Sequence, residues 1–384
     1  MKVVIVGGGP AGLAAGGALQ QKGIPSSILE QGDKVGTSWR GHYDRLHLHT
    51  IRRLSGLPGL PIPSEMGKWV ARDDLVRYLE EYSKRFGLDI HPHTDVLRVE
   101  KSDGGWRVKT EQGDHAADRV VMATGYNRTP VLPDWPGRDE FEGELIHSAR
   151  YRNATRYKDK RVLVIGSGNS GAEIAVDLVD GGAKEVLIAI RTPPNIQRRE
   201  FFGIATQQVG ILAEKLPVKL ADRISLALQK VAIGDLRPYG LDAPKRGAMS
   251  RIYEDAQIPL IDVGFLDALR QRRLKVVPAV EGFTAGAVML AGGARVQPDA
   301  VIAATGYSRG LERLVGHLGV LRPDGSPEPS GGDESPNAPG LLFIGYRNAP
   351  GGLLRRIRIE AEAMAQVLAT RFVGPAGPAA ETAA

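Results

Sequence analysis

The stretch VVIVGGGPAG at residues 3–12 decides the fold, because a β-branched run leads into G-x-G-x-x-G and a helical pattern follows. In such a loop the first glycine makes the tight turn, the second lets the backbone approach a pyrophosphate, and the third lets helix and strand pack closely. We expect Gly7, Gly9 and Gly12 to take these roles. Glu30 ends the next predicted strand, where a carboxylate accepts hydrogen bonds from ribose hydroxyls and repels a 2′-phosphate. The site therefore suits FAD, and NAD less well.

A second stretch, RVLVIGSGNSG at residues 161–171, repeats the pattern. Its expected cofactor-binding residues are Gly166, Gly168, Ser170 and Gly171. At the position that matches Glu30 this copy carries Arg191, which can pair with a 2′-phosphate and so favours NADPH over NADH. A surface arginine at a strand end is the alternative, and Arg198 and Arg199 are weaker candidates for the same contact.

Another pair of segments repeats as well, DRVVMATGY at 118–126 and DAVIAATGY at 299–307. Each Ala-Thr-Gly follows a buried-strand pattern, and we expect Thr124, Gly125 and Gly306 to contact the cofactors. The alternation of the two motifs predicts an α/β fold with two Rossmann-like dinucleotide-binding domains, arranged as in glutathione reductase, with one inserted into the other. We expect an FAD domain at 1–156 and 306–373, an NADPH domain at 157–305 and a disordered tail at 374–384.

Composition excludes several classes of function. The 384 residues contain no cysteine, so redox dithiols and thiolate metal sites are absent, and no metal site is expected. The net charge of +6 comes with only short basic clusters, so we expect no nucleic-acid partner. No apolar run is long enough for a membrane span, and the first strand begins at once, which predicts a cytoplasmic protein.

The segment FEGELIHSARY at residues 141–151 fits F-x-G-x-x-x-H-x-x-x-Y at all four fixed positions, just ahead of the second glycine loop. In this the chain resembles class B flavin monooxygenases. Baeyer–Villiger relatives end the motif in tryptophan, whereas Tyr151 resembles the flavin-containing and N-hydroxylating branch. The resemblance implies a structural motif that couples the two domains, so His147 is not expected to act as a base.

Further segments resemble the plant YUCCA-type enzymes: GTSW at 36–39, YDRLHLH at 43–49, the Pro-rich 57–63, and GLLFIGY at 340–346 with GGLL at 351–354. Many flavin-containing monooxygenases carry asparagine, near the flavin oxygen adduct, where His49 stands, and His49 is the candidate catalytic residue; a packed structural histidine is the alternative. The resemblance implies that five more residues lie near the flavin: Gly36, Trp39, Gly345, Gly352 and Leu353.

The resemblance implies that NADPH reduces FAD and that O₂ then gives a C4a-(hydro)peroxide, which oxygenates a small organic substrate. The reaction is expected to be either decarboxylation of an aryl α-keto acid such as indole-3-pyruvate or N- or S-oxygenation of amines or sulfides. A flavin reductase of a quinone or protein partner and a non-enzymatic nucleotide sensor are the competing classes. Residues 195–260 match least and are expected to form a lid or interface. Monomer and homodimer both remain open. The basic run Arg355, Arg356 and Arg358 is expected to bind a substrate carboxylate or NADP phosphates, or to face outward.

Overall fold

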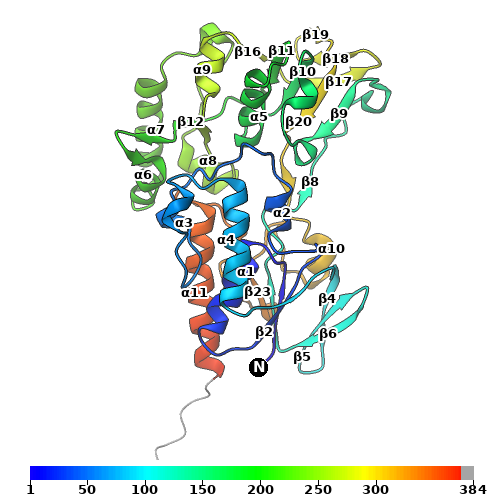
Figure 1. The fold of residues 1–384 in the computed structure, drawn as a ribbon, viewed down its shortest axis with the longest axis vertical. Helices are drawn as coiled ribbons and strands as arrows, with labels where there is room; N and C mark the ends of the chain where they lie inside the picture. Colours follow the sequence, from blue (N-terminus) through cyan, green and yellow to red (C-terminus); the bar gives the residue numbers. More distant parts are fainter. Residues whose placement is uncertain (373–384) are drawn as a thin grey trace, which may run out of the picture.

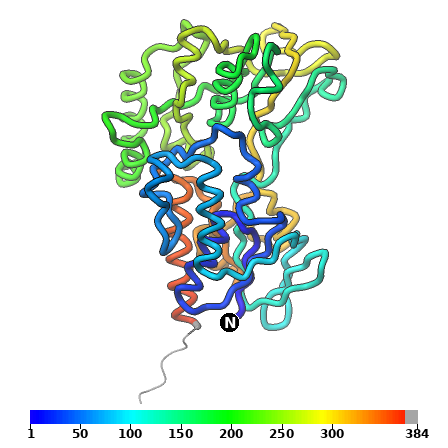
Figure 2. The backbone as a smooth tube through the Cα atoms, viewed as in Figure 1, coloured from blue at the N-terminus to red at the C-terminus, as the bar shows by residue number. Residues whose placement is uncertain are grey.

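The computed structural model describes residues 1–372, so the predicted tail at 374–384 lies outside the described residues. Figure 1 shows two lobes, one above the other, and the N-terminus lies in the lower lobe. The backbone tube in Figure 2 passes from the lower lobe to the upper one and returns, so that the last helix packs beside the first. Within the described part of the chain, no helix combines the length and the apolar character that crossing a membrane requires.

The lower lobe is built on a six-stranded sheet whose order is β22-β23-β7-β1-β2-β3. Strand β1 pairs in parallel with β2 and β7, and its four residues are fully or almost fully buried, as expected for a parallel sheet covered on both faces. The strands are β1 (Val3–Val6), β2 (Ser26–Leu29), β3 (Asp89–His91), β7 (Arg119–Met122), β22 (Glu334–Ser335) and β23 (Ala338–Phe343).

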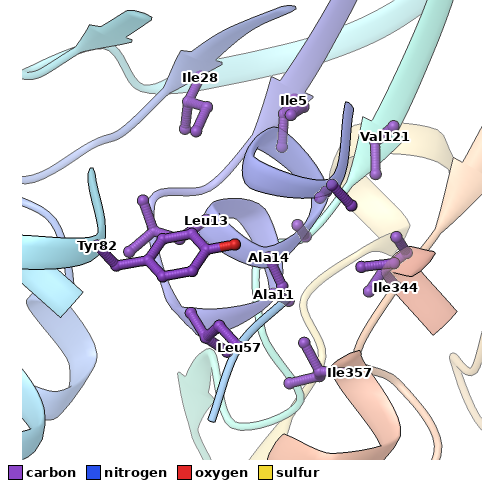
Figure 3. Packing of buried hydrophobic residues seen from close by; sticks show 14 of the residues in the cluster. Ile5, Ala11, Leu13, Ala14, Ile28, Leu57, Tyr82, Val121, Ile344 and Ile357 are labelled. Carbon is purple, nitrogen blue, oxygen red and sulfur yellow. The ribbon is translucent and has the colours of Figure 1, made fainter. Parts of the chain in front are cut away.

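Helices α1 (Pro10–Gln20) and α11 (Leu353–Phe372) pack against each other beside this sheet. Figure 3 shows the core that they form, which includes Leu13 of α1, Ile5 of β1, Ile357 of α11 and Tyr82 of helix α4 (Arg72–Arg85). A Cβ at Gly17 would lie 2.0 Å from the Tyr82 hydroxyl oxygen, so the glycine makes room for the ring. That hydroxyl donates to the Pro58 carbonyl at 2.8 Å, which satisfies a buried polar group.

The upper lobe contains a five-stranded parallel sheet of order β16-β11-β10-β20-β9. Because β9 precedes the second glycine loop and pairs with β20, the chain joins this sheet before it enters β10. The domain boundaries expected above remain a prediction. The elements are β9 (Glu144–His147), β10 (Arg161–Ile165), α5 (Asn169–Asp180), β11 (Glu185–Ala189), α9 (Phe265–Arg270), β16 (Leu274–Val277) and β20 (Ala300–Ala303).

Both expected strand–glycine loop–helix–strand units are confirmed, as β1-α1-β2 and β10-α5-β11. The sequence also predicts a strand at 106–110, after the turn at Asp103, Gly104 and Gly105, and this strand lies within β5 (Gly105–Thr110). It further predicts a helix at 73–86 with Asp73 as its N-cap; the helix is α4 (Arg72–Arg85), but the N-cap is wrong, because the capping position is Ala71. Asp73 lies in the first turn and pairs instead with Arg72, at 2.8 Å.

The remaining elements form small sheets and short helices around these two layers. They are α2 (Thr37–Arg40), α3 (Arg52–Ser55), β4 (Val96–Ser102), β5 (Gly105–Thr110), β6 (Gly113–Ala117), β8 (Thr129–Pro130), β12 (Ile196–Arg198), β13 (Glu200–Phe201), β14 (Ile204–Ala205), α6 (Thr206–Ala213), α7 (Val218–Ile233), α8 (Ala248–Glu254), β15 (Leu260–Asp262), β17 (Val280–Thr284), β18 (Ala287–Leu290), β19 (Arg295–Val296), β21 (Tyr307–Ser308) and α10 (Glu312–Val315).

Candidate active site

In the first glycine loop, two glycines are required by the packing of the protein and one leaves room for a ligand. Gly7 has φ +109°, and a Cβ there would lie 2.6 Å from the Ala123 carbonyl oxygen; a Cβ at Gly12 would lie 1.8 Å from the Gly7 carbonyl oxygen. Gly9 differs, because its φ of −81° suits any residue and its Cβ would meet no protein atom within 4 Å. The fold therefore requires Gly7 and Gly12, whereas Gly9 leaves open space at the N-terminus of α1, which fits a pyrophosphate approaching the backbone.

The second loop reproduces this arrangement. A Cβ at Gly166 would lie 2.4 Å from the Ala304 carbonyl oxygen, one at Gly171 would lie 2.0 Å from the Gly166 carbonyl oxygen, and one at Gly168 would meet nothing within 4 Å. Ala123 and Ala304 each begin an Ala-Thr-Gly repeat, since β7 neighbours β1 and β20 neighbours β10. The structure thus accounts for the alternation of the two motifs: each Ala-Thr-Gly closes against its own glycine loop.

The Ala-Thr-Gly repeats leave their glycines open as well. Gly125 and Gly306 have φ values of +96° and +87°, and a Cβ at either would meet no atom within 4 Å. The backbone N–H of Thr124 donates to the Tyr346 hydroxyl at 3.0 Å. This contact ties the first repeat to the end of the lower sheet.

Glu30 is a buried carboxylate at the end of β2, only 5% exposed. Its Oε2 accepts the Gly8 N–H at 2.6 Å, and its Oε1 accepts the Gly32 N–H at 2.8 Å and the Thr37 hydroxyl at 3.0 Å. These donors fix the carboxylate beside the first glycine loop. Contact with a ribose, expected from the sequence, stays a prediction.

The segments expected near the flavin converge on the same end of the lower sheet. The Gly36 N–H donates to the Gly8 carbonyl at 3.0 Å, and Trp39 follows in α2. A Cβ at Gly345 would lie 3.0 Å from the Ala11 Cβ, and one at Gly352, which has φ +88°, would lie 2.5 Å from the Thr50 Cγ2. Leu353 then begins α11.

His49 lies against a residue that sequence reasoning missed. Its Nε2 is 2.5 Å from Oε1 of Glu173, whose side chain is only 4% exposed, on helix α5 two residues after Gly171. The Tyr43 hydroxyl contacts both Glu173 and Ser170. Burial, reinforced by the Glu173 carboxylate, raises the pKa of the Tyr43 phenol well above its usual range, so Tyr43 is a neutral hydrogen-bond donor. We call Tyr43, His49, Ser170 and Glu173 the His49 cluster.

Two side chains of the upper lobe hold the loop that carries His49. The Arg199 Nη2 donates to the Leu48 carbonyl at 2.5 Å, and its guanidinium lies 4.2 Å from the centre of the Trp69 ring. Burial lowers the pKa of Arg199 to about 10, which leaves it charged at neutral pH. The buried Gln207 accepts the Ile51 N–H at 2.8 Å and donates to the Gly351 carbonyl at 2.6 Å. Arg199 is thus held beside His49 by its contacts with Leu48 and Trp69.

The 141–151 motif has a packing role. A Cβ at Gly143 would lie 2.5 Å from the Phe141 ring, which explains the F-x-G spacing. The His147 Nδ1 accepts the Ala149 N–H at 3.1 Å, so its Nε2 donates to the Gly306 carbonyl at 3.0 Å. Burial lowers the pKa of His147. The Tyr151 hydroxyl donates to Asp177 of α5 at 2.6 Å. The histidine and tyrosine thereby tie this segment to the second Ala-Thr-Gly and to the helix after the second glycine loop.

The arginines predicted to bind phosphates or a carboxylate differ in their exposure and in their partners. Arg191 follows β11 with its side chain exposed, at the end of the sheet where the second glycine loop lies. Arg356 pairs with the buried Glu360 at 2.8 Å within α11. Arg355 and Arg358 lie on the same helix and are partly buried. The expected contacts of Arg191, Arg355 and Arg358 with phosphates or a carboxylate stay predictions.

Comparisons with known proteins give one matching family and several similar enzymes. Residues 4–201 match the family described as pyridine nucleotide-disulphide oxidoreductase. The chain is 34% identical to the probable indole-3-pyruvate monooxygenase YUCCA3 of Arabidopsis thaliana over 89% of this chain and 81% of that protein. It is 37% identical to the indole-3-pyruvate monooxygenase YUCCA1 of Oryza sativa subsp. japonica, over 83% and 79%.

Solved structures agree with these relatives. A flavin-containing monooxygenase from Stenotrophomonas maltophilia superposes with a TM-score of 0.72 at 25% identity, covering 97% of this chain and 98% of that one. Cyclohexanone monooxygenase in its loose conformation superposes with a TM-score of 0.74 at 18% identity, covering 97% and 88%, which shows the shared fold alone.

Proposed function

The chain belongs to the family of YUCCA-type flavin monooxygenases, and we propose that within it the chain acts on an α-keto acid with an aryl side chain. It is an FAD-dependent oxidoreductase that uses NADPH, and its small-molecule substrate reacts with O₂. The predicted family, fold class and cofactors are therefore confirmed. The keto-acid substrate is the finer step, and it is supported by identity to relatives named for indole-3-pyruvate.

Two sets of residues would hold the cofactors. For FAD they are Gly7, Gly9, Gly12, Glu30, Gly36, Trp39, Thr124, Gly125, Gly345, Gly352 and Leu353. For NADPH they are Gly166, Gly168, Ser170, Gly171, Arg191 and Gly306. The open space at Gly9 and Gly168 supports this assignment, because neither glycine is required by the protein's own packing. When bound, FAD takes a hydride from NADPH and passes electrons to O₂.

The observation that carries the proposed mechanism is the contact between His49 and Glu173. A carboxylate that accepts from Nε2–H keeps the proton on that nitrogen and leaves Nδ1 with its lone pair, so that Nδ1 can accept a hydrogen bond from an O–H of a reacting group. Tyr43, whose pKa is raised by burial and by the Glu173 carboxylate, stays neutral beside the same carboxylate. We propose that His49 so oriented is the catalytic residue that hydrogen-bonds the reacting oxygen, and that Glu173 is its positioning residue.

The residues around His49 are largely buried, while the His49 side chain itself is 19% exposed. Gln207 and Arg199 hold the loop around His49 through buried hydrogen bonds to Ile51 and Leu48. Glu173, Tyr43 and Gln207 are each nearly fully buried. Burial of these neighbours limits the water that can reach His49, and a site with little water favours oxygenation over release of hydrogen peroxide.

The stoichiometry of the reaction tests the proposal. An α-keto acid, O₂, NADPH and a proton give the acid shortened by one carbon, CO₂, NADP⁺ and water. We expect purified holoenzyme to form one indole-3-acetate from indole-3-pyruvate for each NADPH oxidised. Oxygenation of thioanisole or N,N-dimethylaniline in its place would support the N- and S-oxygenation alternative. Reduction of a quinone without any oxygenated product would support a reductase and overturn the proposal.

A further inference from the structure

Helix α7 (Val218–Ile233) carries an apolar stripe on its outer side. Leu220, Ile224, Leu228 and Val231 are 45%, 42%, 53% and 87% exposed, and their spacing places them along one face of the helix. Ala221 and Ile233 are buried and lie on the inner side. The helix is therefore apolar toward both the protein and solvent, and Figure 1 shows it at the outer edge of the upper lobe.

Segments that precede α7 in the chain also expose large apolar side chains. Leu212 and Leu216, at the end of α6 and in the connection that follows, are 65% and 40% exposed. Phe202 and Ile204, at the hairpin of β13 and β14, are fully exposed and 54% exposed. We call these four residues and the stripe of α7 the α6–α7 surface. So many large apolar side chains exposed within one short segment indicate a surface that binds a partner.

Charge identifies the kind of partner. Lys219, Arg223 and Lys230 are exposed and lie along the border of the stripe, and Lys215 precedes them. Residues 201–234 contain only two acids, Glu214 and Asp222.

Both acids are turned toward the protein. Glu214 accepts the Gly351 N–H at 2.9 Å, and Asp222 accepts the Met249 N–H at 2.8 Å and the Ser250 hydroxyl at 2.5 Å. The outward side of α7 is thus apolar and cationic.

We propose that the α6–α7 surface docks on a lipid bilayer that contains anionic headgroups, with α7 lying in the plane of the interface. An apolar face bordered by lysine and arginine suits the boundary between headgroups and acyl chains, where the side chains insert and the cations meet lipid phosphates. A second copy of this chain fits less well, because it would bring the cations of two α7 helices together with no acidic partner.

Docking there would place the membrane next to the candidate active site. A Cβ at Gly210 of α6 would lie 2.7 Å from the Pro350 carbonyl oxygen, and Gln207 of α6 binds the Gly351 carbonyl. Helix α6 therefore packs on the segment that leads into α11. The surface itself contains none of the residues assigned to cofactors or to the His49 cluster.

The experiment is co-sedimentation of the full-length holoenzyme with phosphatidylcholine vesicles, with and without phosphatidylglycerol. We expect binding to rise about tenfold or more with phosphatidylglycerol and to fall as salt is added. The double variant Ile224→Glu with Leu228→Glu is expected to lose binding to both vesicles. The triple variant Lys219→Glu, Arg223→Glu and Lys230→Glu is expected to lose the preference for the anionic lipid.

The control is Val367→Glu, which replaces an exposed apolar residue by glutamate outside the α6–α7 surface, at a 46% exposed position of α11. Flavin content and NADPH oxidation without vesicles check that each variant is folded. Vesicle binding that both multiple variants retain would overturn the proposal. So would absence of vesicle binding together with a dimer, in sedimentation velocity, that the apolar double variant dissociates, because a second copy would then cover the surface. Absence of both vesicle binding and dimer would overturn it as well.

Discussion

His49 and Glu173 are 124 residues apart in the sequence, yet the imidazole Nε2 lies 2.5 Å from the carboxylate Oε1. One belongs to the loop held against the start of α11, and the other to the helix that follows the second glycine loop. A buried carboxylate is costly unless it is paired and hydrogen-bonded, and Tyr43 and His49 supply donors from the other lobe. This contact couples the two nucleotide loops at one point.

Replacing Glu173 tests that coupling. Glu173→Gln keeps an oxygen acceptor for His49 but removes the charge, and hydrogen bonds to charged groups contribute about 1.5–3 kcal/mol. We expect the product formed per NADPH to fall roughly tenfold or more, with hydrogen peroxide making up the difference, while flavin stays bound. Hydrogen peroxide and NADP⁺ measured in the same reaction give this ratio. Glu185→Gln, which removes a partly exposed carboxylate paired with Lys275, is the control and should leave the ratio unchanged.

We expect alanine substitutions at Gly9 and at Gly12 to have different effects. Gly9→Ala adds a methyl group where no protein atom lies within 4 Å, so the variant should fold and lose FAD affinity. Gly12→Ala places a methyl group 1.8 Å from the Gly7 carbonyl oxygen, and such overpacking costs about 1–3 kcal/mol or more of unfolding free energy. Flavin content and urea unfolding of the two variants separate these effects. Equal loss of stability in both would contradict the assignment of Gly9 to the cofactor.

The second loop gives a prediction on NADPH. Arg191→Gln should lower kcat/KM for NADPH by about 10- to 100-fold, because a charge-assisted contact of about 1.5–3 kcal/mol is lost, and it should leave the value for NADH nearly unchanged. Arg198→Gln tests the weaker candidate for the same contact, and Arg295→Gln, an exposed arginine of β19, is the matched control. If Arg191→Gln keeps the wild-type ratio of NADPH to NADH, the assignment of Arg191 to the 2′-phosphate is wrong.

Two histidines predict how stability depends on pH. Burial lowers the pKa of His147, and burial with Arg152 and Arg72 lowers the pKa of His42, both from 6.5. The unfolded chain therefore binds more protons below pH 6.5 than the folded chain does, and the free energy of unfolding falls as the pH drops through and below that value.

Each such histidine contributes a slope of up to about 1.4 kcal/mol per pH unit. His147→Gln should flatten the slope, whereas His317→Gln, at an exposed position, should not. Urea unfolding at several pH values measures both. An unchanged slope for His147→Gln would show that His147 does not carry this dependence.

The repeated motifs were enough to predict the architecture, because G-x-G-x-x-G and Ala-Thr-Gly each sit at a strand end and recur in order. Glu173 could not be found in this way. It lies between Ala172 and Ile174 on α5, and it is only 3% exposed because the segment that carries His49 packs against it. Such burial comes from contacts between lobes, which helical periodicity does not encode. The prediction of Asp73 as an N-cap was wrong for a local reason, because helix α4 begins at Arg72, one residue earlier than expected.

The most direct test of the proposed reaction follows oxygen atoms. Holoenzyme is supplied with NADPH, indole-3-pyruvate and ¹⁸O₂, and the ¹⁸O content of the products is measured by mass spectrometry. The account predicts indole-3-acetate with one ¹⁸O in its carboxylate, the other ¹⁸O in water, and one NADPH consumed for each acid formed. Catalase should leave the yield of this acid unchanged. Loss of the acid on addition of catalase would contradict the account, because the keto acid would then be oxidised by released H₂¹⁸O₂, which also leaves one ¹⁸O in the carboxylate.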